Sequence, residues 1–523
     1  MKLKTDFLII GGGVSGLSLA IKLSQLSPDK KILLITKEEL KECNTYYSQG
    51  GVACVWDEND SFEKHIKDTL RAGDGLCNEE VVRKIITQVS ERIKELIEWG
   101  VDFSKNSEGE YDLGREGGHS ERRILHVNDL TGRYIEEALI KRVKECENVE
   151  IREDMCAINL YERNMKCYGV YVQNQDNKEI HNISAGATIL ATGGCGKIYL
   201  YTSNPDVASG DGIAMAYRAG AAISNMEFFQ FHPTCLYHPY AKSFLITEAM
   251  RGEGAILKDL NGREFMKDYH PMKDLAPRDI VSRAIDSELK RSGDDYVLLD
   301  IASQKDPEFI KKHFPGVHKR CLEFNIDITK EPIPVVPAAH YCCGGVNAKI
   351  DGTTQVKNLY VIGESACTGL HGANRLASNS LIEGLVCGHN CAKTLASKSD
   401  NLKIKEFKPW EPGNAIPSTE AIVITQNWDE IRRFMQNYVG IVRTDKRLQR
   451  AKKRINLLLD EVERYYWDFK IEKNLIELRN LATVAKIIIV SAISRKESRG
   501  IHYNVDYPNK AKIARPTVIE RPW

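Results

Sequence analysis

The stretch Phe7-Leu8-Ile9-Ile10-Gly11-Gly12-Gly13-Val14-Ser15-Gly16 decides the fold of this chain, because an apolar run meets spaced glycines. The run predicts a buried strand, and apolar residues at helical spacing predict a helix over residues 14–26. A second apolar run, Ile32–Ile35, predicts another strand. Strand, glycine turn, helix and strand make a βαβ unit with parallel strands. The sequence therefore predicts an α/β fold with a doubly wound, Rossmann-like sheet.

The glycines have the spacing Gly11-x-Gly13-x-x-Gly16, which is typical of dinucleotide binding. The first glycine allows a tight turn, the second admits a pyrophosphate, and the third lets the helix pack on the strand. An acidic residue is expected near the end of the second strand to bind the ribose. Here Lys37 comes first and Glu38 follows, so the ribose contact is not fixed by the pattern.

Elements far apart in the chain favour FAD as the dinucleotide. The polar segment 44–51 follows the βαβ unit, and a strand over 359–362 ends at Gly363-Glu364 hundreds of residues later. NAD usually needs one compact half of such a sheet, whereas a prosthetic flavin suits contacts spread along the chain. The alternative for Gly363-Glu364 is an ordinary loop after a strand.

The chain divides into three predicted domains. A strand at 187–190 and the strand at 359–362 return to the same sheet, while the segment between them is richer in turns, His, Pro and charge. We therefore predict a discontinuous FAD-binding domain over 1–225 and 341–405, with an inserted α+β capping domain over 226–340. A Lys-rich connector with Pro409, Pro412 and Pro417 then leads to a C-terminal helical domain over 415–523. Its helices are predicted at 428–438, 446–467 and 475–494.

Composition excludes several classes of protein. The 523 residues carry 73 Lys and Arg against 72 Asp and Glu, a net charge of +1. Such a balance argues against nucleic acid or an anionic membrane as the main partner. No secretion signal and no apolar stretch of bilayer length is found. The 14 cysteines show no metal-ligand spacing, which predicts reduced, buried thiols and a cytoplasmic protein.

Motifs distributed along the chain give it a resemblance to a known family. It is similar to the succinate dehydrogenase and fumarate reductase flavoproteins through Gln49–Gly51, Ser209–Gly212, Phe231–Thr234, Thr247–Gly254, Ala276–Asp279 and Glu497–Gly500. The resemblance extends over nearly the whole chain. It is strongest to the branch of that family that oxidises L-aspartate, through Arg115–Ser120, Pro337–Tyr341 and Gly369–Leu381.

Two positions separate the branches of this family. Succinate dehydrogenases of membrane complexes have a histidine that bonds covalently to FAD where this sequence has Asn44, so the resemblance implies non-covalent FAD. Dicarboxylate dehydrogenases have an apolar Phe where this chain has Glu116. A carboxylate at that position can pair with a substrate ammonium.

The resemblance also implies a set of flavin contacts. These residues are Gly11, Gly12, Gly13, Val14, Ser15, Gly16, Lys37, Asn44, Thr45, Tyr46, Tyr47, Ser48, Gln49, Gly50, Gly51, Asp211, Glu364, Ser380 and Leu381. Glu364 would accept from a ribitol or ribose hydroxyl, and Lys37 would reach the adenosine end. A helix that begins near Ser380 would direct its positive end toward the reduced flavin.

Substrate residues are implied in the same way. L-aspartate needs cationic or donor anchors for two carboxylates, and His232, Thr247, His340 and Arg375 match that requirement. The alternatives are a structural turn role for His232 and an interdomain salt bridge for Arg375. Arg443 and Arg499 are expected in interdomain ion pairs, and the alternative is that they face the active-site cleft.

Proton transfer is assigned by the resemblance to Arg278, with Glu248 and Arg251 as its relay. An arginine has so high a pKa that it needs a neighbouring carboxylate and a dry site to exchange protons. The alternative for Arg278 is simple binding of a substrate carboxylate.

The implied activity is FAD-dependent oxidation of L-aspartate to iminoaspartate. Dioxygen, giving hydrogen peroxide, or fumarate, giving succinate, would reoxidise the flavin, and the imine would pass to quinolinate synthase for NAD biosynthesis. One rival is a soluble fumarate reductase or succinate dehydrogenase flavoprotein, from which Glu116 discriminates. The other is a flavin-binding structural or RNA-associated subunit, which would need a basic surface.

Overall fold

A computed structural model describes residues 2–128, 130–239, 244–418 and 420–521. A seven-stranded sheet forms its centre, in the order β6-β2-β1-β9-β8-β7, with β16 also paired to β9. These strands are β1 (Lys2–Ile10), β2 (Ile32–Ile35), β6 (Val149–Arg152), β7 (Met155–Glu162), β8 (Cys167–Asn174), β9 (Ile180–Leu190) and β16 (Leu359–Val361). Strand β1 runs parallel to β2 and β9, and β16 runs parallel to β9. The predicted α/β fold with parallel strands is thus confirmed, and β8 and β7 extend the sheet as antiparallel strands.

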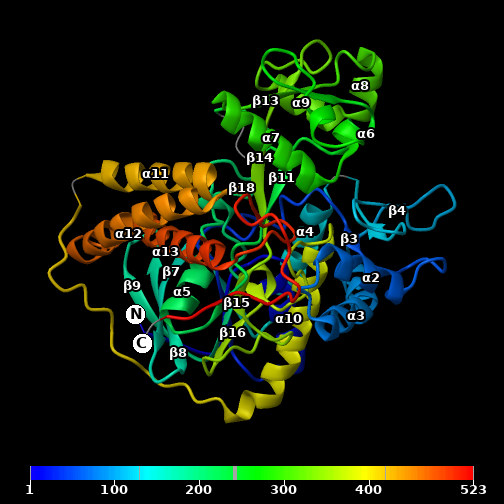
Figure 1. The fold of residues 1–523 in the computed structure, drawn as a ribbon. Coiled ribbons are helices and arrows are strands. Elements are labelled where there is room, and N and C mark those ends of the chain that lie inside the picture. Colours follow the sequence, from blue (N-terminus) through cyan, green and yellow to red (C-terminus); the bar gives the residue numbers. More distant parts are fainter. Residues whose placement is uncertain (1, 129, 240–243, 419, 522–523) are drawn as a thin grey trace.

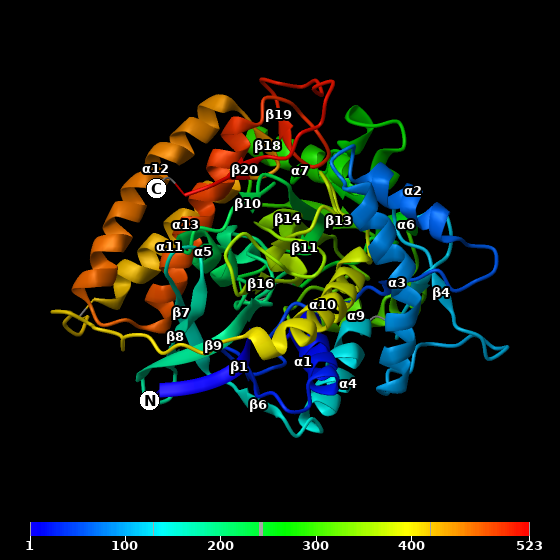
Figure 2. The ribbon, with the colours of Figure 1, turned by 90° about the horizontal axis from the view of Figure 1, so that it is seen from below.

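Side chains of the central strands alternate between two hydrophobic cores, as the period of a strand requires. Phe7 and Ile9 of β1 belong to a core formed with α1 (Val14–Leu26), α3 (Glu79–Glu98), α4 (Thr131–Lys144) and α10 (Asn379–Lys398). Leu8 and Ile10 belong to the other core, formed with α5 (Asp211–Arg218) and α13 (Lys473–Ser494). Figure 2 shows these two groups of helices on opposite sides of the sheet.

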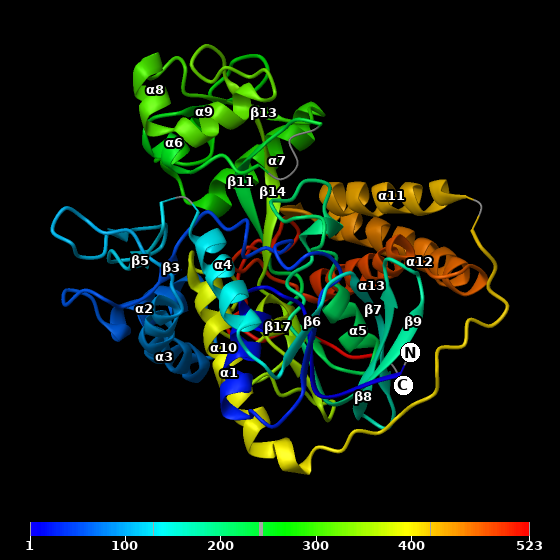
Figure 3. The same ribbon diagram turned by 180° about the vertical axis from the view of Figure 1, so that it is seen from behind.

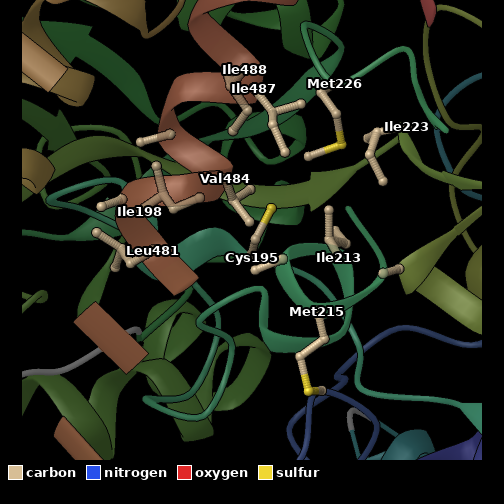
Figure 4. Close-up of a cluster of buried hydrophobic side chains, with 14 of the residues drawn as sticks. Cys195, Ile198, Ile213, Met215, Ile223, Met226, Leu481, Val484, Ile487 and Ile488 are labelled. Atoms are coloured by element: carbon tan, nitrogen blue, oxygen red, sulfur yellow. The ribbon is translucent and has the colours of Figure 1, made fainter. Parts of the chain in front are cut away.

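Three long helices form the C-terminal part of the chain: α11 (Ala421–Val439), α12 (Asp445–Asp468) and α13. They confirm the three predicted helices, and α11 begins seven residues before its predicted start. The connector over residues 402–418 runs along the outside of the molecule (Figure 3). Leu481, Val484 and Ile488 of α13 pack in one cluster with Cys195 and Ile213 of the sheet domain (Figure 4). Burial of this apolar face holds the helices on the sheet.

The segment between β9 and β16 contains a second, four-stranded antiparallel sheet in the order β11-β14-β13-β12. Its elements are β11 (Phe229–Leu236), α6 (Ala249–Gly252), β12 (Ile256–Lys258), α7 (Arg278–Ser292), β13 (Val297–Asp300), α8 (Pro307–His313), α9 (Pro315–Leu322) and β14 (Ile333–Cys342). This part stands above the rest of the molecule in Figure 1. We call it the cap.

Strands β11 and β14 connect the cap to the body of the molecule. Phe231 and Ala339 lie in a core of the body, whereas Leu236 and Val335 on the same two strands lie in the core of the cap. The register of the pair shifts between His232 and Cys235, an irregularity that bends strands. Because β14 passes through residue 340, the predicted domain limit there falls inside a strand. The limits themselves remain a prediction.

The remaining elements are short. They are α2 (Phe62–Ala72), β3 (Val52–Ala53), β4 (Leu113–Gly114), β5 (Ile124–Leu125), β10 (Ile223–Ser224), β15 (Gly345–Asn347), β17 (Ala366–Cys367), β18 (Val442–Arg443), β19 (Tyr503–Asn504) and β20 (Val518–Ile519). Within the described residues, no helix is long and apolar enough to cross a membrane, and no cluster of side chains could hold a metal ion. All 14 cysteines are free thiols, and most are buried, as predicted.

The expected ion pairs of Arg443 and Arg499 need correction. Arg443 is buried and donates to the carbonyl oxygens of Val439 and Glu227, at 3.0 and 2.7 Å, so it bridges segments through backbone oxygens. Arg499 pairs with Glu497, two residues away in its own segment, and also donates to the carbonyl of Asp74 at 2.8 Å. Both arginines join distant parts of the chain through backbone oxygens, and not through the ion pairs that were expected.

Glu136 of α4 is fully buried, and burial raises its pKa well above the ordinary value against a weaker opposing effect of Cys43. An unfolded glutamate ionises near pH 4.3. Above that pH the unfolded chain loses a proton that the folded protein keeps, so stability falls as pH rises toward the folded pKa. We expect Glu136→Gln to raise the thermal unfolding midpoint by a few degrees at pH 8 and to change it less at pH 5. A midpoint that falls by the same amount at pH 8 and at pH 5 would contradict this prediction.

Candidate active site

The glycine turn between β1 and α1 leaves no room for side chains. A Cβ at Gly11 would lie 2.1 Å from the carbonyl oxygen of Ala191, and Gly11 has a φ of +114°. A Cβ at Gly16 would lie 2.0 Å from the carbonyl oxygen of Gly11. The hydroxyl of Thr45 accepts from the first amide of α1, that of Val14, at 3.1 Å. The turn is therefore packed against β9, and its backbone is available to a pyrophosphate.

Asn44 and Glu364 contact each other beside this turn. The Asn44 amide donates to Glu364 Oε2, and the backbone amide of Cys342 donates to Glu364 Oε1, both at 3.1 Å. Burial raises the pKa of Glu364 to about 7, although these hydrogen bonds oppose the rise. The buried Oδ1 of Asn44 has no hydrogen-bond partner among the described residues. A ligand with hydroxyl groups would satisfy these acceptors.

The N-terminus of α10 is the third element predicted to contact the flavin. Ser378 precedes the helix with a φ of +59° and does not cap it with its side chain. The first amides of α10, at Ser380 and Leu381, are therefore not satisfied by a side-chain cap. An electron-rich ring with carbonyl oxygens fits such a helix end. Glycine turn, polar acceptors and helix end together fit FAD.

Tyr46, Ser48 and Gln49 of the predicted flavin segment lie in the loop before β3, where Gln49 and Gly50 are exposed. Tyr47 is also exposed, and its hydroxyl donates to Glu42 at 2.6 Å. Gly51 contacts β5, since a Cβ there would lie 2.4 Å from the carbonyl oxygen of Leu125. The segment thus has exposed groups and packs against β5 at Gly51.

Lys37 and Asp211, both predicted to contact FAD, contact each other. The Lys37 amine lies 2.7 Å from Asp211 and 2.6 Å from Glu477 of α13. Burial lowers the pKa of Lys37, but the two carboxylates outweigh it and raise the pKa overall. Asn480 donates to Asp211 at 2.8 Å. Glu477 and Asn480 were missed from the sequence, because their helical spacing indicates only a helix face.

A cavity of about 490 Å³ lies between the cap, the sheet domain and the C-terminal segment. Glu248, Arg251 and Arg278 line it from the cap. Arg375 lines it from the segment before α10, and Ile441 and Ile501 close it from the C-terminal part. Residues of the cap, of the segment before α10 and of the C-terminal part therefore share this cavity.

The three residues predicted for proton transfer form one cluster. Glu248 Oε1 lies 2.8 Å from Arg251 Nη2 and 2.8 Å from Arg278 Nε. Arg278 is the first residue of α7, directly after Pro277. Burial lowers the pKa of Arg251, and the positive charge of Arg278 adds to this effect while Glu248 opposes it. One carboxylate thus joins two guanidinium groups at the cavity wall.

Arg375 is fixed by three partners. Its Nε and Nη2 donate to Gln230 Oε1 at 3.2 and 3.0 Å, and its Nη1 donates to Ser380 Oγ at 2.9 Å. Its guanidinium lies 4.5 Å from the ring centre of Tyr341, a cation–π contact. These hydrogen bonds go to amide and hydroxyl oxygens, unlike those of the interdomain salt bridge considered as an alternative. Burial lowers the pKa of Arg375.

His232 and His340 face each other across β11 and β14, with ring centres 5.9 Å apart. Burial lowers the pKa of both rings, helped by Arg278 at His232 and by Arg375 at His340, so both are neutral near pH 7. His340 Nδ1 lies 2.7 Å from the hydroxyl of Ser203. Thr247 accepts from the amide of Ala249 at 3.3 Å, so its own hydroxyl proton is available. Neutral imidazoles can donate to a substrate carboxylate without adding charge.

Glu116 lies beside the cavity, next to Gly117 and Gly118, which line it. Ser378 Oγ donates to Glu116 Oε2 at 2.6 Å. A Cβ at Gly50 would lie 3.0 Å from Glu116 Oε1, so the carboxylate sits between the 49–51 segment and the start of α10. It therefore brings a negative group to the place where the two flavin elements meet.

Comparison with known proteins now identifies the family. The FAD binding domain family matches residues 6–381, and the fumarate reductase flavoprotein C-terminal family matches residues 428–515. The chain is 52% identical to L-aspartate oxidase of Pseudomonas aeruginosa, over 99% of this chain and 98% of that protein. The chain belongs to the L-aspartate oxidase family. It is also 45% identical to the chloroplastic L-aspartate oxidase 2-a of Nicotiana tabacum, over 98% of this chain and 83% of that protein.

Solved structures place the L-aspartate oxidase family within the succinate dehydrogenase and fumarate reductase flavoprotein fold. An E. coli quinol fumarate reductase chain superposes with a TM-score of 0.89 at 28% identity, covering 100% of this chain and 96% of that one. A Mycobacterium smegmatis Sdh1 chain gives a TM-score of 0.88 at 28% identity, covering 99% and 94%. FAD is accordingly the cofactor of this chain.

The structure of this L-aspartate oxidase site also contains supporting residues that the sequence did not indicate. Gln230 accepts hydrogen bonds from Arg375, and the ring of Tyr341 makes a cation–π contact with the same guanidinium. The hydroxyl of Tyr341 lies 3.1 Å from His371, which lies 2.9 Å from the buried Glu383. Gln230 directly precedes the Phe231–Thr234 motif, and His371 lies inside another motif, so proximity to the motifs could have indicated both.

Proposed function

We propose that this chain oxidises L-aspartate to iminoaspartate. The observation that carries the proposal is one cavity with cationic anchors, Arg278 and Arg375, and with the Glu116 carboxylate beside it. L-aspartate has two carboxylates and one ammonium, and this set of groups matches its charges. The high identity to L-aspartate oxidases along the full chain supports the proposal.

Each group has a role in this reaction. Arg375, fixed by Gln230, binds one carboxylate bidentately, and His232, His340 and Thr247 donate to the other. Glu116 pairs with the ammonium and orients the substrate. Bound FAD supplies the acceptor for the hydride that the substrate loses. Arg278, with Glu248 and Arg251, moves the proton that the substrate releases.

The wider context belongs to the same proposal. Reoxidation would use dioxygen, giving hydrogen peroxide, or fumarate, giving succinate. Oxidation of L-aspartate would be the first step of NAD biosynthesis, and iminoaspartate would be handed to quinolinate synthase in the cytoplasm. Closure of the cap over the cavity would exclude water during the reaction.

An anaerobic titration of the purified protein tests the proposal. L-aspartate is added, and succinate separately, while the absorbance of oxidised flavin is followed. Bleaching by L-aspartate but not by succinate is the expected result. Bleaching by succinate alone would transfer the protein to the dicarboxylate dehydrogenases, and a protein that takes up no FAD would overturn the cofactor assignment.

A further inference from the structure

The orientation of Glu116 is set by residues outside the substrate and flavin sets. Ser378 Oγ donates a hydrogen bond to Glu116 Oε2, whereas Glu116 Oε1 has no hydrogen bond to a described residue. The left-handed φ of Ser378, +59°, is unusual for a residue other than glycine. The amide of Ala53 donates to the carbonyl of Ser378 at 3.2 Å and stabilises this conformation. Ser378 is thus held so that its hydroxyl meets the carboxylate.

A histidine holds the Glu116 loop to the residue before Ser378. Arg123 Nη1 lies 3.0 Å from His119 Nδ1, and His119 Nε2 lies 2.9 Å from the carbonyl of Ala377. Because a guanidinium can only donate, Nδ1 must accept, and Nε2 must carry the proton that goes to Ala377. Burial lowers the pKa of His119, which favours this neutral form.

A buried ion cluster anchors the histidine in turn. Arg123 is fully buried and contacts Asp60 through Nε and Nη2, at 2.7 and 2.9 Å. Its Nη1 contacts Asp68 at 2.7 Å, and Asp68 also accepts from the amide and the hydroxyl of Ser120 at 2.7 Å each. Each group of this cluster has a charged or hydrogen-bonding partner, so the loop over 115–120 has a rigid base.

We propose that Ser378 and His119 are positioning residues that determine the preference for L-aspartate over dicarboxylates without an ammonium. This inference rests on the proposed function and deepens it. Ser378 holds one oxygen of Glu116 and leaves the other for the substrate ammonium, while His119 ties the loop to residue 377. A charge held in place before binding loses less entropy when the ammonium arrives. Succinate and fumarate have no ammonium, so their binding does not depend on this arrangement.

Ser378→Gly tests the proposal, because glycine removes the hydroxyl and keeps the left-handed φ. We expect kcat/KM for L-aspartate to fall about 10- to 100-fold, the range for a lost hydrogen bond to a charged group. Anaerobic fumarate reduction with a reduced dye, and the inhibition constant of succinate, should change less than about twofold. Ser378→Asn, which keeps a donor and tolerates this φ, should recover part of the loss.

The remaining outcomes distinguish a failure of this proposal from a failure of the proposed function. Equal losses with L-aspartate and fumarate would indicate a general structural role and overturn the proposal, as would unchanged kinetics. FAD content and the unfolding midpoint are measured for every variant. If the glycine variant does not fold, His119→Gln supplies the same comparison from the loop side, with the same expected selectivity. If the unaltered protein does not oxidise L-aspartate, the proposed function fails instead.

Discussion

Arg278→Lys is expected to lower kcat for L-aspartate oxidation by about 10²- to 10⁴-fold, the usual range for the loss of a positioned proton-transfer group. Arg278 contacts Glu248 at 2.8 Å through Nε, an atom that lysine lacks. Lysine keeps the positive charge but cannot contact the relay and the substrate in the same geometry. Fumarate reduction should fall similarly, because the same proton transfer is needed in reverse.

The measurement is steady-state kinetics with FAD content checked for each variant. Arg291→Lys is a matched control, since Arg291 lies on the same helix with a side chain that is 63% exposed. It should change kcat by less than about twofold. A raised KM for L-aspartate with an unchanged kcat in Arg278→Lys would instead favour the alternative that Arg278 binds a carboxylate.

Glu116→Gln has the second large expected effect, and it is selective. Loss of the carboxylate leaves a substrate ammonium without its counter-charge, which costs about 2–5 kcal/mol in comparable buried pairs. The expected result is a fall of about 30-fold or more in kcat/KM for L-aspartate. Fumarate reduction should change less than about threefold, since neither fumarate nor succinate carries an ammonium.

Both activities are measured on the same preparations. Glu121→Gln is the control, because Glu121 lies near the same loop, is about one-third exposed and pairs with Lys64 at the surface. It should leave both activities nearly unchanged, since exposed ion pairs contribute little. An equal fall of both activities in Glu116→Gln would show that Glu116 supports the site generally and does not select the amino acid.

The different expected effects of Glu116→Gln and Arg278→Lys indicate how one fold can accept two classes of substrate. In the proposed reaction, Arg375 and the two histidines bind carboxylates, which L-aspartate, succinate and fumarate share, and Arg278 moves the proton. In the same proposal, Glu116 pairs with the ammonium that distinguishes L-aspartate. If both selective losses are found, substrate preference depends on the Glu116 charge and on the residues that hold it, within a fold shared with fumarate reductase.

The sequence by itself determined the local parts of this protein. The apolar run before Gly11 predicts β1, helical spacing predicts α1 and α13, and the glycine pattern places the dinucleotide turn between β1 and α1. These features depend on residues close together in the chain, whose periodicity and backbone freedom are visible in the sequence. The resemblance of the longer motifs predicted the family and its cofactor, FAD.

Only the tertiary structure decided which distant residues meet. Lys37 pairs with Glu477, 440 residues away, and Ser378 meets Glu116, 262 residues away. Arg443 donates to backbone oxygens in place of the expected ion pair. Periodicity indicates which face of an element is buried, but the topology of the fold determines which residues pack against that face. The groups that orient the charged side chains of this site therefore became visible only in the fold.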